Sequence, residues 1–165
     1  MKPKTNLVIH RILALVILAS LTLTATAQKK TDFSGTWNLD KSQSNQHPEF
    51  SWAPVQLNIS HDGNSIAIER VSNFQGQEYR QTSKYSLDGE ESVNEGFQGE
   101  DIISVANWSE GGKGFSIETE FETQDGGTMT IISTYEMKDK QVHIEFVVKG
   151  GPMGESTENW VYTKE

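Results

Sequence analysis

The chain has 165 residues, and its 23 acidic residues outnumber its 14 lysines and arginines, which gives a net charge of −9 at pH 7. This surplus of acid disfavours nucleic acids and anionic membrane surfaces as partners, because both attract clusters of lysine and arginine. The chain has no cysteine, which excludes a disulfide framework and a lipid-modified N-terminal cysteine.

Residues 1–27 have the three parts of a secretory signal peptide. A basic start precedes an apolar stretch over residues 12–19, and Ala25 and Ala27 form the small-residue pattern of a cleavage site. The apolar stretch is shorter than the roughly 20 residues that a membrane-spanning helix needs. We therefore predict that the signal is cleaved, that residues 28–165 form one soluble domain, and that this domain is periplasmic or extracellular without a lipid anchor. That domain keeps 11 basic and 23 acidic residues, a net charge of −12.

The exported part has the pattern of short strands separated by turns. Apolar residues alternate with polar ones at residues 55–59, the Asp62-Gly63 pair predicts a turn, and alternation resumes at residues 66–68. The clearest strand spans residues 115–121, where Glu118 shares the polar face with its neighbouring glutamates. Further strands are predicted at residues 129–137, 142–148 and 156–163.

These segments predict an all-β fold of about eight to ten antiparallel strands in an up-and-down meander. Closure of such a meander into a barrel removes the exposed edges of the sheet. A barrel of this size is either filled by its own side chains or holds one small ligand. The sequence therefore predicts a barrel and leaves its interior open to both interpretations.

The first predicted strand carries the motif Gly35-Thr36-Trp37 within the sequence Asp32 to Asp40. With this start, the exported part resembles the calycin superfamily, and in particular small exported bacterial lipocalin-like domain proteins. The resemblance implies a lipocalin-like β-barrel over residues 28–165. It also implies that Gly35 lets the chain bend into the barrel and that Trp37 plugs one end.

The sequence departs from the fatty-acid-binding members of that superfamily in two ways. Those proteins hold the ligand carboxylate with an Arg-x-Tyr motif on the last strand, and the matching stretch here is Trp160-Val161-Tyr162, which lacks the arginine. Neither Arg70 nor Arg80 is on that strand, and a buried carboxylate without a cation is costly. The two helices that those proteins insert after the first strand have only residues 42–53 as a counterpart. The resemblance therefore predicts the fold more strongly than a fatty-acid ligand.

Catalytic and metal-binding patterns are absent from the sequence. The histidines of the exported part, His47, His61 and His143, are isolated from one another, and no metal-ligand spacing occurs. His61 precedes Asp62-Gly63 and is interpreted as a turn residue. No serine lies in a nucleophile-elbow motif. We predict a protein that is not an enzyme and that has no metal and no cofactor.

Aromatic residues on the predicted strands are the candidates for ligand contact. They either fill the barrel as core or line a cavity that meets an apolar ligand. The first hypothesis is an exported binding protein that holds a small, mostly apolar molecule. The alternative is a structural or interaction protein of the cell envelope with a filled, non-binding barrel. The candidate lining residues are Trp108, Phe115, Phe121, Tyr135, Phe146, Trp160 and Tyr162.

Overall fold

The computed structural model describes residues 29–165 except residues 49, 97–98, 124–125 and 151–153. The predicted signal peptide lies outside the described residues, so its cleavage stays a prediction. Within the described part of the chain, no helix is long and apolar enough to span a membrane.

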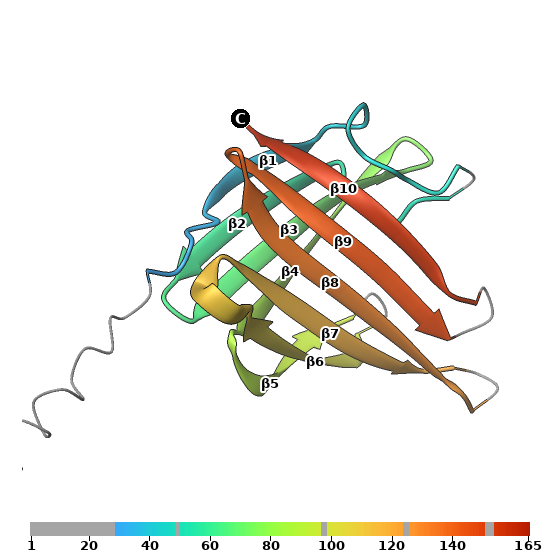
Figure 1. Ribbon diagram of the computed structural model, residues 1–165. Coiled ribbons are helices and arrows are strands. Elements are labelled where there is room, and N and C mark those ends of the chain that lie inside the picture. The colour runs from blue at the N-terminus through green and yellow to red at the C-terminus, as the bar shows by residue number, and fades with distance from the viewer. Residues whose placement is uncertain (1–28, 49, 97–98, 124–125, 151–153) are drawn as a thin grey trace, which may run out of the picture.

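The described residues form one antiparallel sheet of ten strands that curls into a nearly closed barrel (Figure 1). Each strand pairs with the next along the chain, except that β4 and β5 do not, and the first strand also pairs with the last. The predicted all-β meander is therefore confirmed. The strands are β1 (Gly35–Leu39), β2 (Gln56–Asp62), β3 (Ser65–Phe74), β4 (Gln77–Ser86), β5 (Asp88–Glu95), β6 (Asp101–Trp108), β7 (Gly114–Glu122), β8 (Thr128–Lys138), β9 (Gln141–Gly150) and β10 (Ser156–Lys164).

Strands β4 and β5 stand at the two ends of the sheet order, and side chains bridge the seam between them. The Asn94 amide of β5 accepts a hydrogen bond from the Lys84 backbone N–H at 2.7 Å and donates one to the Lys84 carbonyl at 3.0 Å. The Ser92 hydroxyl accepts a hydrogen bond from the Ser86 backbone N–H at 3.0 Å. These contacts occupy backbone groups that would otherwise be unpaired at an edge strand.

One end of the barrel is packed with aromatic side chains, and we call it the closed end. Phe33 and Phe115 are fully buried there with ring centroids 4.9 Å apart, and Trp37 donates a hydrogen bond from Nε1 to the Phe33 carbonyl at 2.9 Å. The His61 side chain is only 6% exposed and lies 5.3 Å from the Trp108 ring, centroid to centroid. His61 belongs to β2, so its interpretation as a turn residue was wrong: its ring completes the aromatic packing.

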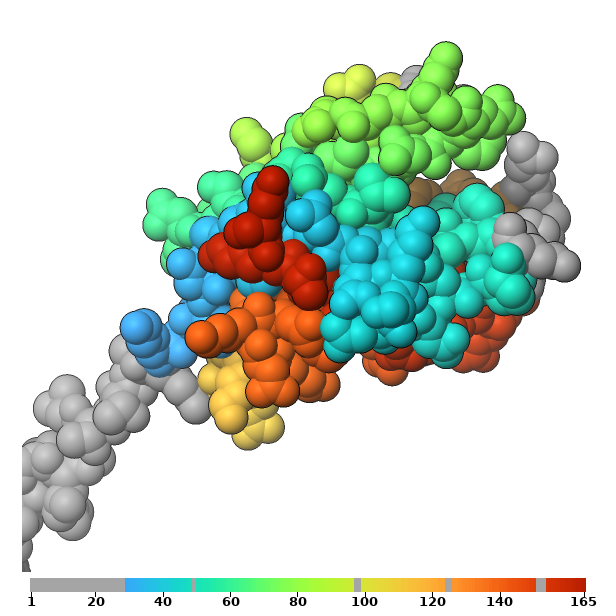
Figure 2. All heavy atoms as spheres, turned by 90° about the horizontal axis from the view of Figure 1, so that it is seen from above, coloured from blue at the N-terminus to red at the C-terminus, as the bar shows by residue number. Residues whose placement is uncertain are grey.

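The segment between β1 and β2 has no helix among its described residues. It is held against β10 by a backbone bridge between Asn45 and Asn159 and by the buried carboxylate of Glu158. Glu158 accepts hydrogen bonds from the Ser51 hydroxyl and from the Trp52 backbone N–H. Figure 2 shows this segment in cyan, packed on the barrel close to the red residues of the C-terminal strand.

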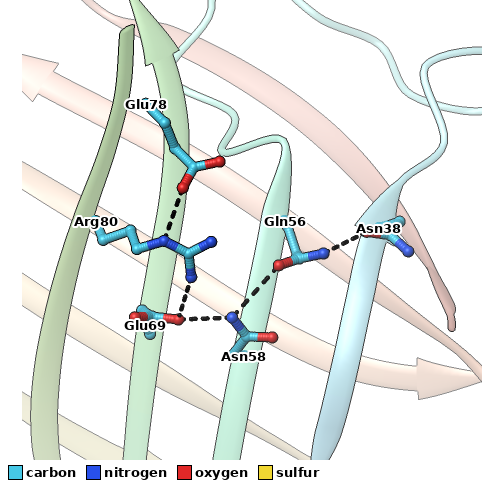
Figure 3. A network of polar contacts seen from close by, with 6 residues as sticks. All are labelled: Asn38, Gln56, Asn58, Glu69, Glu78 and Arg80. Atoms are coloured by element: carbon cyan, nitrogen blue, oxygen red, sulfur yellow. Dashed lines mark hydrogen bonds and ion pairs between the residues drawn. The ribbon is translucent and has the colours of Figure 1, made fainter.

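A row of polar side chains crosses the outer face of β1 to β4 (Figure 3). Arg80 ends the row, and its guanidinium contacts Glu78 at 2.8 Å and Glu69 at 3.0 Å. On β2 and β3 the members of the row lie next to buried residues, so that Asn58 lies between Leu57 and Ile59, and Glu69 follows Ile68. The charge of Arg80 is therefore neutralised by two carboxylates. The row consists of Asn38, Gln56, Asn58, Glu69, Arg80 and Glu78.

We expect Gly35→Ala to destabilise the fold. Gly35 has a φ of +142°, which side-chain-bearing residues rarely adopt, and a Cβ there would lie 2.7 Å from Lys164 Cε. The free energy of unfolding, measured with urea, should fall by about 1–3 kcal/mol. The matched control is Gly63→Ala, where φ is +62° and no atom lies within 4 Å of the added carbon. A smaller loss for Gly35→Ala than for this control would contradict the bend assigned to Gly35.

Candidate ligand-binding site

The barrel encloses a cavity of about 600 Å³ between the closed end and the β3–β4 and β5–β6 hairpins. This volume lies within the range of roughly 300–1,000 Å³ that is usual for small-molecule sites. Tyr79, Gln81 and Glu95 are exposed residues on its wall, so the cavity reaches the surface beside the start of β4. We call this part of the wall the mouth.

Four of the seven aromatic candidates line the cavity. Phe121, Tyr135, Phe146 and Trp160 all contribute to its wall. The Phe146 and Trp160 rings are stacked with their centroids 4.5 Å apart, and Trp52 from the segment between β1 and β2 lies 6.1 Å from Phe146. Together with aliphatic residues of β7 and β8, these rings form an apolar wall.

The other three candidates lie outside the cavity wall. Trp108 and Phe115 belong to the packing of the closed end, where their ring centroids are 6.1 Å apart. The indole N–H of Trp108 is buried and has no hydrogen-bond partner among the described residues. Tyr162 is fully buried, and its hydroxyl donates a hydrogen bond to the Pro54 carbonyl at 2.9 Å. This bond ties the segment between β1 and β2 to the last strand.

Small hydroxyl side chains occupy the middle of the cavity wall. Ser83, Ser104, Thr119 and Ser133 are all buried and line the cavity. The Ser104 and Thr119 hydroxyls are 2.8 Å apart and hydrogen-bonded to each other across β6 and β7. Their small size leaves the space that larger core residues would fill, so this belt keeps the barrel open.

Arg70 is a cavity-lining residue that the candidates omitted. It follows Ile66 and Ile68 on the inner face of β3, and its side chain contacts the cavity. Its Nη1 donates to the Tyr85 hydroxyl at 3.5 Å and its Nη2 donates to the Tyr135 hydroxyl at 3.4 Å. No described carboxylate lies within 4.0 Å of its guanidinium, in contrast to Arg80.

The guanidinium of Arg70 is charged inside the barrel. Burial acts to lower its pKa, but the electrostatic influence of Tyr135 and Tyr85 outweighs burial, so the pKa of Arg70 is raised above its usual value. Its remaining exposed surface faces the cavity. The sequence holds a signal for this position, because the alternation at residues 66–68 continues inward to residue 70. In the fatty-acid-binding proteins the cation inside the barrel is on the last strand, whereas in this structure it is on β3.

The described residues offer no metal centre, since no three His, Asp or Glu side chains gather in them. His47, His61 and His143 remain apart in the fold, on the segment after β1, on β2 and on β9. The chemistry of the cavity is therefore that of an apolar wall, a belt of hydroxyl groups and one cation with two tyrosines.

Comparison with solved structures shows the fold of the chain. It is similar to zebrafish ileal bile acid-binding protein complexed with cholic acid, with a TM-score of 0.55 and 13% identity over 81% of this chain and 98% of that one. It is also similar to lipid binding protein 8 of Caenorhabditis elegans, with a TM-score of 0.53 and 12% identity over 81% of this chain and 95% of that one. No protein-family model and no curated protein sequence matches the chain. These likenesses confirm the predicted all-β barrel fold.

We expect two of the four tyrosines to ionise late. Burial raises the pKa of Tyr135, and burial raises the pKa of Tyr162 well above its usual value near 10. In an alkaline titration followed by tyrosinate absorbance, only two tyrosines should therefore ionise before the protein unfolds. In Tyr135→Phe, one tyrosine instead of two should remain un-ionised until unfolding.

The raised pKa values of Tyr135 and Tyr162 also make the free energy of unfolding depend on pH in the alkaline range. A raised pKa favours the neutral hydroxyl in the folded state, so this contribution to the free energy of unfolding is complete below a pH of about 10. It is lost as the pH rises through the folded-state pKa. Four tyrosines that ionise together in the folded protein would contradict the burial of this pair.

Proposed function

We propose that this calycin-fold chain is an exported protein that holds a small, mostly apolar molecule inside its barrel. The cavity of about 600 Å³, with its wall of aromatic and aliphatic side chains, is the observation that carries the proposal. A barrel that served only as a scaffold would be filled by its own side chains. The cavity therefore favours the binding protein over the envelope interaction protein with a filled barrel.

The apolar wall can supply the affinity that such a ligand needs. Ile117, Phe121, Ile131, Phe146 and Trp160 face the same space. Removal of about 200 Å² of apolar ligand surface from water contributes roughly 5 kcal/mol, part of which offsets the lost freedom of the bound ligand. Stacked Phe146 and Trp160 add a rigid surface for this contact at little conformational cost.

The two structural neighbours support the same class of ligand. One carries bile acid binding in its name and was solved with cholic acid, and the other is named a lipid binding protein. Both names describe small molecules with a large apolar part. Which molecule of this class fits is determined by the wall of the present cavity.

Export is the second part of the proposal. It rests on the basic start, the apolar stretch and the Ala25–Ala27 pattern within residues 1–27. The first described strand begins at Gly35, so cleavage after Ala27 would leave all ten strands intact. The exported product would then be the barrel with a short N-terminal lead.

Neutral N-phenylnaphthylamine should bind the purified residues 28–165 with a rise in its fluorescence. Ile131→Trp places a large ring on the cavity wall and should weaken this binding about tenfold or more. The matched control is Ile103→Trp, because Ile103 is 48% exposed and absent from the cavity wall. A folded wild-type protein that binds no apolar dye would contradict the proposed function.

Expression of the full chain in a bacterial host should yield a product that starts at Gln28, as measured by intact mass after cell fractionation. Ala27→Leu should block this cut, because only small residues are accepted immediately before a signal cleavage site. Thr26→Leu, between the two small positions, should leave it unchanged. Recovery of the uncut chain from the cytoplasm alone would refute export.

A further inference from the structure

The guanidinium of Arg70 has more donors than the described residues satisfy. An arginine side chain carries five N–H donors, and Arg70 uses two of them in long hydrogen bonds of 3.4 and 3.5 Å to tyrosine hydroxyls. A buried cation without a counter-ion is costly. Arg80, one strand away at the border of the same cavity, contacts two carboxylates, and no described carboxylate plays this part for Arg70.

The two tyrosines around Arg70 lack acceptors in the same way. Each hydroxyl accepts from Arg70, which leaves its own proton to donate. Among the described residues, neither proton has an acceptor. The guanidinium and the two O–H groups therefore form a set of donors that converge on the cavity without an acceptor.

We propose that Arg70, Tyr85 and Tyr135 form a subsite for the anionic head group of the ligand. The proposal rests on the proposed function, because it describes the ligand of the same cavity. Two oxygens on one atom match the planar fork of the guanidinium, so the head group is an oxyanion such as a carboxylate and the ligand is an anionic amphiphile. The tyrosine O–H groups donate further hydrogen bonds to the same oxygens.

The position of the subsite sets the orientation of the ligand. Tyr135 stacks on Phe115 at 4.4 Å between centroids, and Phe115 belongs to the closed end. Along β8 from Tyr135 back towards the β7–β8 hairpin, Ser133 and then Ile131 line the cavity, and Phe121 lies near the end of β7. The anionic head group therefore binds on the side of the cavity nearer the closed end, and the apolar chain extends past the buried serine and threonine hydroxyls.

The proposed subsite differs in position from the carboxylate site of the fatty-acid-binding proteins. The last-strand position at which fatty-acid-binding proteins have an arginine is Trp160 here, and Trp160 forms part of the apolar wall. The cation comes from β3, on the opposite side of β1 from β10 in the sheet order. In this chain the head group would therefore contact β3, and the side of the cavity at Trp160 would contact the apolar tail.

The test compares dodecanoate with dodecanol, two ligands with the same chain and different head groups, by displacement of bound N-phenylnaphthylamine. Wild-type protein should bind dodecanoate about tenfold or more tighter than dodecanol. Arg70→Met has a similar volume and no charge, so it should abolish this preference and leave dodecanol affinity within about twofold. The matched control is Lys84→Met, which removes the same charge from an exposed site on β4 and should keep the preference.

Stability separates the subsite from a structural role of Arg70. Without ligand, Arg70→Met should unfold at the same or a higher urea concentration than wild type, because a half-buried cation without a counter-ion is removed. A loss of stability in Arg70→Met, together with an unchanged preference for dodecanoate in Arg70→Lys and Tyr135→Phe, would assign the arginine to the fold and overturn the subsite. If Arg70→Met does not fold, Arg70→Lys and Tyr135→Phe serve in its place, and each should reduce the preference for dodecanoate.

The outcomes distinguish the two proposals. Equal affinity of wild type for dodecanoate and dodecanol, with both bound, overturns the anionic subsite and leaves the proposed function intact. Binding of neither ligand, and no binding of N-phenylnaphthylamine, overturns both. A preference for dodecanoate that persists in Arg70→Met places the head group elsewhere and overturns the subsite.

Discussion

The pairing of the first strand with the last is the interaction on which the barrel depends. β1 hydrogen-bonds to β2 on one side and to β10 on the other, with Trp37 opposite Lys164 and Leu39 opposite Tyr162. Lys164 strengthens the join, because its ammonium lies 5.3 Å from the Trp37 ring and donates to the Ser34 carbonyl. Two halves of the meander are thereby joined into one sheet, and the cavity exists because that sheet curves around it.

The interior is divided between a part that stabilises the fold and a part that does not. At the closed end, Phe33, Trp37 and Phe115 are buried and in mutual contact or hydrogen-bonded. Beyond them, small hydroxyl residues and Arg70 border empty volume, where each large apolar side chain would add stability. Local departures from good packing of this kind are typical of functional sites, and the well-packed end compensates for them.

The two-residue period predicted the strands from the sequence, because residues such as Glu118 and Ile117 differ clearly in polarity between the two faces. The barrel was predicted from closure of the meander and from the motif at Gly35 and Trp37. The alternation of apolar and polar residues did not identify Arg70 as a cavity residue. By polarity alone, a charged residue is assigned to the outer face even where its position in the strand points inward. The alternation also does not show how far along the barrel a residue lies. Phe115 and Phe121 share one face of β7, and only the strand register places Phe115 at the closed end and Phe121 in the cavity wall. The contact of Glu158 with Ser51 joins residues far apart in sequence, so no local signal predicts it.

The seam between β4 and β5 has a consequence for how the protein behaves at high concentration. These strands carry the two edges of the sheet that lack a backbone ladder, and such edges are the usual points at which β-proteins add strands from other molecules and aggregate. The Asn94 amide occupies both the N–H and the carbonyl of Lys84, and Ser92 occupies the N–H of Ser86. A strand from a second molecule would have to displace these side chains before it could pair. The seam therefore opposes edge-to-edge association with other molecules.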